Sequence, residues 1–180
     1  KEDPIRMLRA IKFASRLDFG MSPEVYEAAV SCRGALAMAA RPRVSEEILR
    51  LMRGGAAQRA VWLLWEMGML DILLPEVSAY LRDQADDSAF WNRLTLLDAW
   101  TKAQGSPPDD ILLWLCLLAD PLLEHTEDAE VRADVIEDSL EPIIERLALT
   151  RRQADGIRRI LITLPKVRFG RAKRFSRSPL

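Results

Sequence analysis

Apolar residues recur at steps of three and four along most of the chain, which is the spacing of the buried face of an α-helix. No stretch alternates convincingly between apolar and polar residues as a half-buried strand does, and there is no Asn-Gly hairpin turn and no internal repeat. We therefore predict an all-α protein, a multi-helix bundle of mostly antiparallel neighbours joined by short loops.

Capping residues and helix breakers set the expected ends of the helices. Asp3 is a good N-cap, Pro4 fits the first helical position after it, and Gly20 ends this first helix. Ser45 is expected to cap the third helix, and Thr150 the last one. Further helices are predicted at about residues 22–32, 45–53, 56–67, 88–103, 109–119, from 126 and from 150.

The expected core follows from the apolar faces of these helices. The helix at 109–119 is apolar almost all round, which is typical of a helix at the centre of a bundle. On the other helices the apolar side is expected to face the core, and Val25 and Val135 are among the residues placed there. The five tryptophans also lie in apolar stripes, so packing is favoured over stacking on RNA bases. They are Trp62, Trp65, Trp91, Trp100 and Trp114.

The charges are divided unevenly, although the 180 residues together carry a net charge of only −1. Residues 1–82 carry 12 basic and 10 acidic side chains, residues 83–145 carry 3 and 16, and residues 146–180 carry 11 and 1. We therefore expect a boundary in the region of residues 75–88. The predicted units are a helical domain at 1–82, a helical body domain at 83–165 and a basic tail at 166–180.

The basic end of the chain is a candidate surface for RNA. Arginines in the last predicted helix repeat at an offset of seven residues, which places them on one side of it. They are Arg151, Arg152, Arg158 and Arg159. The tail adds cations interleaved with Phe169 and Phe175, and its predicted RNA contacts are Lys166, Arg168, Arg171, Lys173 and Arg174. A solvated face and a flexible tail are the alternatives that the pattern leaves open.

The sequence lacks the residues that several other kinds of functional site require. His125 is the only histidine, which leaves no parts for a Ser-His or Cys-His catalytic unit or a multi-histidine metal site. The longest apolar run, residues 111–119, is shorter than the roughly 20 residues that cross a bilayer, and no signal peptide is visible. Cys32 and Cys116 are expected to be buried, reduced thiols, as in a cytoplasmic protein.

One charged cluster lies at the start of the first helix, where Asp3 precedes Arg6 by one turn. The residues that continue this stripe are Arg9, Phe13 and Arg16. A carboxylate beside a guanidinium offers an acceptor next to a forked donor, which matches the exocyclic amine and ring nitrogen of adenine or cytosine. An Asp–Arg pair that only caps the helix is the alternative that spacing leaves open.

The literal sequence of this helix, EDPIRMLRAIKFA at residues 2–14, resembles the nucleobase-recognition motif of the bacterial poly(A) polymerase and CCA-adding nucleotidyltransferase family. The segments RPRVSEEILRLMRGG at 41–55 and GMLDILLPE at 68–76 are similar to the parts of that family that close its neck domain. In the family, the Asp and Arg of the motif hydrogen-bond the base of the incoming nucleotide, which implies those roles for Asp3 and Arg6. Glu2 and Arg9 would support or contact the nucleotide.

The resemblance also implies a reaction. The family transfers nucleotides, with ATP as a substrate, to RNA 3′ ends such as those of mRNA or tRNA, and carboxylates of an N-terminal head hold Mg²⁺. The chain lacks this head, so we expect it to be the neck and body of a longer enzyme, to bind no Mg²⁺ itself and to be inactive alone.

The resemblance covers two kinds of enzyme, poly(A) polymerases and CCA-adding enzymes. A poly(A) polymerase is favoured over a CCA-adding enzyme because residues 118–122 lack the His-Asp pair of CCA-adding enzymes with a phosphohydrolase domain, and because the C-terminal segment is basic. Use of ATP alone and use of CTP with ATP are not distinguished, since Asp3 and Arg6 would serve both. The second hypothesis is a non-catalytic helical RNA-binding or scaffold module. The oligomeric state is left open.

Overall fold

The computed structural model describes residues 3–17, 19–83, 89–124 and 133–168, and all regular structure in these ranges is helical. This confirms the predicted all-α class. The helices are α1 (Ile5–Leu17), α2 (Pro23–Cys32), the 3₁₀ helix η1 (Arg33–Met38), α3 (Arg41–Met52), α4 (Ala57–Glu66), α5 (Leu70–Leu73), α6 (Pro75–Asp83), α7 (Ala89–Gln104), α8 (Asp110–Leu123), α9 (Ala133–Leu147) and α10 (Arg151–Arg168).

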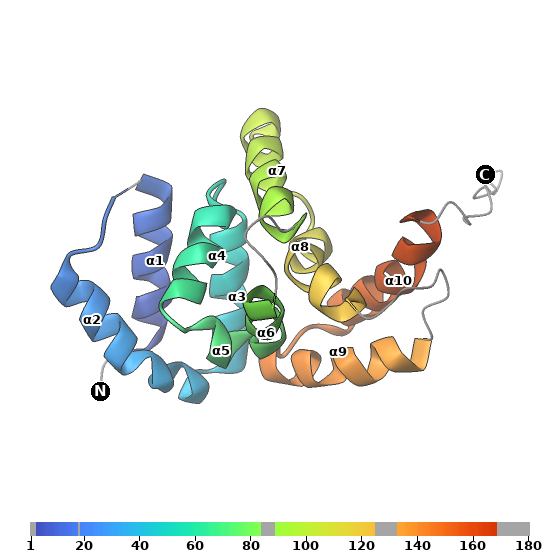
Figure 1. Ribbon diagram of the computed structural model, residues 1–180, viewed down its shortest axis with the longest axis horizontal. Helices are drawn as coiled ribbons and strands as arrows, with labels where there is room; N and C mark the ends of the chain where they lie inside the picture. The colour runs from blue at the N-terminus through green and yellow to red at the C-terminus, as the bar shows by residue number, and fades with distance from the viewer. Residues whose placement is uncertain (1–2, 18, 84–88, 125–132, 169–180) are drawn as a thin grey trace.

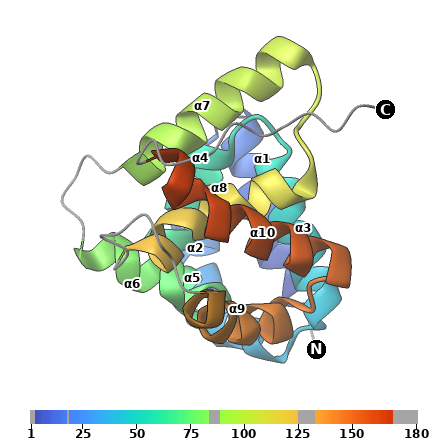
Figure 2. The same ribbon diagram turned by 90° about the vertical axis from the view of Figure 1, so that its right-hand side faces the viewer.

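Helix α8 lies at the centre of the arrangement, as its all-round apolar sequence predicted. Figure 1 shows α1 and α2 at one end of the molecule, α9 and α10 at the other, and α7 projecting from the middle. Helix α8 packs against α3, α6, α7, α9 and α10, and Figure 2 shows α10 lying across it. The helix continues beyond the predicted end at residue 119, through Pro121 to Leu123.

A single apolar cluster joins the two halves of the chain. It runs from Ile5 of α1 to Leu161 of α10, and it includes both Leu81 of α6 and Phe90 of α7. The division into domains at 1–82 and 83–165 stays a prediction.

Several predicted helix ends are confirmed by cap geometry, whereas α1 ends at Leu17 rather than at Gly20, and the start predicted at residue 126 lies outside the described residues. The Asp3 carboxylate accepts a hydrogen bond from the Ile5 N–H at 3.2 Å, as expected of an N-cap. At the last helix, Thr150 Oγ1 accepts from the Gln153 N–H while Gln153 Oε1 accepts from the Thr150 N–H, which is a capping box. Gly68 has a φ of +67° just after α4, the left-handed conformation that glycine supplies at helix ends.

The start of α3 was predicted wrongly. The helix begins at Arg41, with Ala40 as its N-cap, and Ser45 is a buried residue inside it. Pro42 explains the earlier start, because proline fits the first turn of a helix, where its missing N–H leaves no hydrogen bond unmade. The short elements η1, α5 and α6 were also not predicted.

Several side chains are more exposed to solvent than predicted. Val25 and Val135 are 48% and 50% exposed, and Cys32 is exposed rather than buried. Among the tryptophans, Trp114 is fully buried, and Trp65 and Trp91 pack against the core in an edge-to-face pair with ring centroids 6.2 Å apart. Trp62 and Trp100, by contrast, are 41% and 45% exposed.

Candidate functional site

Helix α1 presents its predicted charged stripe to solvent because its other face is locked into the core. Ile5, Leu8 and Ile11 are at most 1% exposed, in a helix that packs on α3 and α4. The opposite face carries exposed residues at helical spacing. They are Arg6, Arg9, Phe13 and Arg16.

Asp3 is held at the start of this stripe by two hydrogen bonds. One carboxylate oxygen caps Ile5, and the other accepts from Arg43 Nη2 of α3 at 2.6 Å. The hydrogen bond from Arg43 lowers the pKa of the Asp3 carboxyl, followed by the Ile5 N–H and, as the smallest contribution, the charge of Arg9. A carboxylate has about four lone-pair sites, so Asp3 remains able to accept a further hydrogen bond.

Arg9 is held one turn beyond Arg6 by a buried carboxylate. Glu47 of α3 is 3% exposed, and its Oε1 accepts from Arg9 Nε at 3.3 Å and from Arg50 Nη1 at 2.9 Å. Its Oε2 is buried without a hydrogen-bond partner among the described residues. A buried carboxylate needs such cations, since burying a lone charge is costly.

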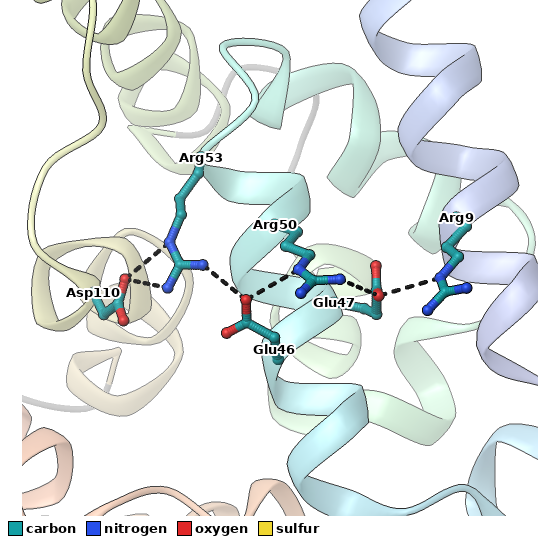
Figure 3. A network of polar contacts seen from close by, with 6 residues as sticks. All are labelled: Arg9, Glu46, Glu47, Arg50, Arg53 and Asp110. Carbon is teal, nitrogen blue, oxygen red and sulfur yellow. Dashed lines mark hydrogen bonds and ion pairs between the residues drawn. The ribbon is translucent and has the colours of Figure 1, made fainter.

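These contacts continue as a chain of ion pairs along α3 (Figure 3). Glu46 accepts from both Arg50 and Arg53, at 3.0 and 3.1 Å. Arg53 in turn donates two hydrogen bonds, of 3.1 and 2.7 Å, to Asp110 at the start of α8. Helix α3 therefore connects the charged face of α1 to the central helix of the bundle.

The structure places the predicted nucleotide contacts as follows. Asp3, Arg6 and Arg9 lie on the first two turns of one exposed face, and the Arg6 N–H donates to the Asp3 carbonyl at 3.0 Å. Glu2 lies outside the described residues. Sequence reasoning missed Arg43 and Glu47, although both lie in the segment at 41–55 that resembles the family.

Two cavities of about 330 and 340 Å³ lie elsewhere. The first lies between η1, α3, α5 and α9, and the second between α1, α2 and α4. Neither is lined by Asp3, Arg6 or Arg9.

The arginines of α10 differ in their surroundings. Arg151 and Arg152 have side chains 94% and 83% exposed, and Arg159 is exposed as well. Arg158 is only 26% exposed, because it pairs with Asp155 at 3.0 Å and with Glu137 of α9 at 3.3 Å. Of these four predicted RNA contacts, Arg158 is therefore the least available to phosphate.

The remaining predicted RNA contacts are not placed by the structure. The side chains of Lys166 and Arg168 lie outside the description, as do residues 169–180, which include Arg171, Lys173 and Arg174.

The described residues give little support for a metal site, a membrane-spanning helix or a reactive thiol. No group of three or more His, Cys, Asp and Glu side chains there is arranged to hold a metal ion. Of the helices in the described residues, none combines the length and the apolar character needed to cross a bilayer. Burial raises the pKa of the Cys116 thiol, which makes it a poor nucleophile. His125 lies outside the description.

Comparison with known proteins gives matches to poly(A) polymerases and CCA-adding enzymes. Residues 18–81 match a family model described as the probable RNA and SrmB-binding site of polymerase A. Poly(A) polymerase I of Escherichia coli O157:H7 is 34% identical over 86 residues, 48% of this chain and 18% of that protein.

CCA-adding enzymes match the chain as well. That of Bacillus velezensis is 32% identical over 90 residues, 50% of this chain and 22% of the enzyme. That of Listeria monocytogenes serotype 4b is 40% identical over 120 residues, 67% of this chain and 28% of the enzyme. The matches to these three relatives thus span 18–28% of their length.

Proposed function

Because the chain is similar in sequence to the family of bacterial poly(A) polymerases and CCA-adding enzymes, we propose that it is part of an RNA 3′-end nucleotidyltransferase. Its role in this proposal is to select the nucleobase and to bind RNA. The observation that carries the proposal is the exposed face of α1, where Asp3, with its lowered pKa, stands one turn from Arg6. Further support comes from residues 18–81, which match the family model described as a probable RNA and SrmB-binding site.

The hydrogen-bonding groups on the edge of a base explain how Asp3 and Arg6 would select adenine or cytosine. An ionised carboxylate accepts a hydrogen from the exocyclic amine of adenine or cytosine, and a guanidinium donates to a ring nitrogen. Guanine and uracil present a carbonyl oxygen where that amine would be, and a carboxylate repels it. As the resemblance to the family implies, Mg²⁺ and the triphosphate are proposed to be held by carboxylates of a head domain of the complete enzyme.

The favoured member of the family is a poly(A) polymerase that adds AMP from ATP to RNA 3′ ends. The support is the basic C-terminal segment and the absence of a His-Asp pair at residues 118–122. A CCA-adding enzyme is the second candidate, and its support is the 40% identity to such an enzyme over 120 residues. Incubation of the complete protein with short RNA and each nucleotide separates the two, because a poly(A) polymerase produces a growing ladder from ATP whereas a CCA-adding enzyme stops after three additions.

Replacing Arg6 by alanine in the complete protein is expected to relax the choice of nucleotide more than it weakens RNA binding. A good bidentate base contact is worth about 1–3 kcal/mol of discrimination, so the preference for ATP over GTP should fall by roughly 5- to 150-fold. The measurement is kcat/KM for each nucleotide with one RNA primer. Arg16→Ala, further along the same exposed face, is the matched control and should retain the preference. An unchanged preference in the Arg6 variant would remove the basis of the proposal.

Removing the exposed charges of α10 is expected to weaken RNA binding without altering nucleotide choice. In a variant with Arg151, Arg152 and Arg159 replaced by alanine, the slope of log K against log salt should flatten by about 0.7 for each phosphate of a single strand that the protein no longer neutralises. Titration of RNA at several salt concentrations measures it. Arg82→Ala, which removes one exposed charge on α6, serves as the control. The same slope in the triple variant and the parent would show that α10 is only a solvated face.

If the protein is instead a non-catalytic RNA-binding or scaffold module, these assays should give a different result. The complete protein would then bind RNA with the salt dependence just described but would extend no primer with any nucleotide.

A further inference from the structure

Two positively charged side chains lie against the turn that joins α3 to α4. The turn contains Gly54 and Gly55, and a Cβ atom on Gly54 would lie 3.3 Å from Cδ of Arg16, in the last turn of α1. A Cβ atom on Gly55 would lie 3.8 Å from Cε of Lys102, in the last turn of α7. Helices far apart in the sequence thus bring two cations to neighbouring residues of one turn.

These two cations have no acidic partner among the described residues. Arg16 and Lys102 are exposed, and neither forms an ion pair or a side-chain hydrogen bond within the described part of the chain. Arg50 and Arg53, which lie close by in the sequence, are both bound to the carboxylate of Glu46, at 3.0 and 3.1 Å. The charges of Arg16 and Lys102 are therefore available to an anion, whereas those of the neighbouring arginines are already paired.

The backbone holds Lys102 beside the turn. Gly55 has a φ of +70°, a left-handed conformation that glycine adopts without strain. Asp98 of α7 accepts from the N–H groups of Ala57 and Gln58, which follow the turn, at 2.6 and 3.0 Å. Lys102 comes one turn after Asp98 on the same helix, so these hydrogen bonds fix its backbone relative to the start of α4.

The turn lies between the two surfaces proposed above. On one side, Arg16 belongs to the exposed face of α1 that carries Arg6, and ten residues of helix separate the two by about 15 Å. On the other side, Arg53 donates to Asp110 at the start of α8, the helix that α10 crosses (Figure 2). An RNA strand that runs along α1 from the proposed base site therefore meets the turn before it reaches α10.

Resting on the function proposed above, we propose that Arg16 and Lys102 bind phosphates of the RNA primer between the base site and α10. Exposed cations without acidic partners attract an anion, and a strand can present a phosphate to each of them. A stacked strand rises about 3.4 Å per nucleotide, so these phosphates would lie roughly four nucleotides from the growing 3′ end. Both residues lie outside the segment 18–81 that matches the RNA-binding family model.

The first test is a titration of the complete protein with a single-stranded RNA of ten nucleotides at several salt concentrations. The Arg16→Ala, Lys102→Ala double variant is expected to bind about tenfold more weakly, because one exposed ion pair is worth up to about fivefold. The slope of log K against log salt should flatten by about 1.4, which is about 0.7 for each lost phosphate contact. A double variant with the parental affinity and slope would overturn the inference.

Arg82→Ala is the matched control for this titration. Arg82 is also an exposed cation in the last turn of a helix, α6, but it pairs with Asp71 at 3.4 Å. It should leave the affinity and the slope unchanged. Cations in the last turn also stabilise their helices through the helix dipole, so a double variant that unfolds at lower urea but binds RNA like the parent would give Arg16 and Lys102 only that role.

Primer length locates the contact along the strand. With a ten-nucleotide primer, the double variant should show a KM for RNA about tenfold above that of the parent. With a primer of two nucleotides, which is too short to reach from the base site to the turn, the two proteins should have the same KM. An equal rise with both primers would place the contact at the 3′ end and overturn the inference.

Nucleotide kinetics distinguish the RNA phosphates from the triphosphate of the incoming nucleotide. At saturating RNA, the KM for ATP and the preference for ATP over GTP should be unchanged in the double variant, because neither side chain contacts the nucleotide. A raised KM for ATP with unchanged RNA affinity would assign the two cations to the triphosphate instead, against the inference.

The outcomes also separate this inference from the proposed function. A parent protein that adds no nucleotide to any primer would overturn both. If the parent extends the primer and Arg6→Ala loses the nucleotide preference, but the double variant binds RNA like the parent, the function stands and the inference is wrong. Should the double alanine variant fail to fold, Arg16→Gln with Lys102→Gln keeps the length of the side chains, and the same loss of affinity is expected.

Discussion

Replacing Trp114 by alanine is expected to destabilise the protein by about 3–5 kcal/mol, the cost of removing a large aromatic side chain from a core. Trp114 is 0% exposed and lies on α8, which packs against helices from both halves of the chain. The surrounding helices cannot collapse fully into the space, so the variant buries less apolar area and packs less tightly. Urea denaturation of the chain followed by circular dichroism measures the loss of stability.

Two further variants show whether burial is the cause. Trp62→Ala removes a side chain that is 41% exposed and should cost less than about 1.5 kcal/mol. Trp114→Phe keeps most of the volume, and the indole Nε1 that it removes has no hydrogen-bond partner among the described residues, so its cost should fall well below that of alanine. Equal losses for Trp114→Ala and Trp62→Ala would mean that the core is not centred on α8.

The helices that could be predicted from the sequence are those whose ends carry a local signal. Ser22 before α2, Asp109 before α8 and Thr150 before α10 all act as N-caps within a few residues of their own chain. Helix α5 has only four residues, too few to show a helical period, and so it escaped prediction. Ser45 gave a misleading signal because a serine inside a helix resembles a cap in sequence.

The candidate site likewise contains residues that the local sequence could predict and residues that it could not. Asp3 and Arg6 could be predicted because both belong to one turn of one helix. Arg43 and Glu47 contact α1 across 40 and 38 residues of sequence, and nothing in the local pattern indicates which helix α3 faces. Their roles depend on how the helices pack, and packing is decided by side chains spread over the whole chain.

The face of α1 depends for its geometry on helices that carry no base contact themselves. The ion pairs along α3 end at Asp110, and the neighbouring Asp109 caps α8 while it pairs with Arg152 of α10 at 3.5 Å. Polar contacts therefore connect the proposed nucleotide face with the proposed RNA face along the surface. Each exposed pair is weak, so the buried packing of α1, α3 and α8 must supply most of the rigidity.

Replacing Asp98 by alanine is expected to destabilise the protein by about 2–3 kcal/mol, more than the loss of an ordinary helix cap. Asp98 is a 9% exposed residue of α7, and its two oxygens accept from the N–H groups of Ala57 and Gln58 at 2.6 and 3.0 Å. These are the first residues of α4, whose own N-cap position is Ala56, a residue without a side-chain acceptor. Asp98 thus caps α4 from a different helix.

The cost should be large because the groups left behind are buried. Ala57 is 0% exposed, so its N–H cannot turn to water when the carboxylate is removed, and the favourable interaction with the helix dipole is lost as well. Asp109→Ala is the matched control, since Asp109 is an exposed N-cap of α8 and should cost about 1 kcal/mol. Asp98→Asn, which keeps one acceptor oxygen, should fall between the two. Urea denaturation ranks the three variants, and if Asp98→Ala costs no more than Asp109→Ala, the capping of α4 by α7 contributes no more than a surface cap.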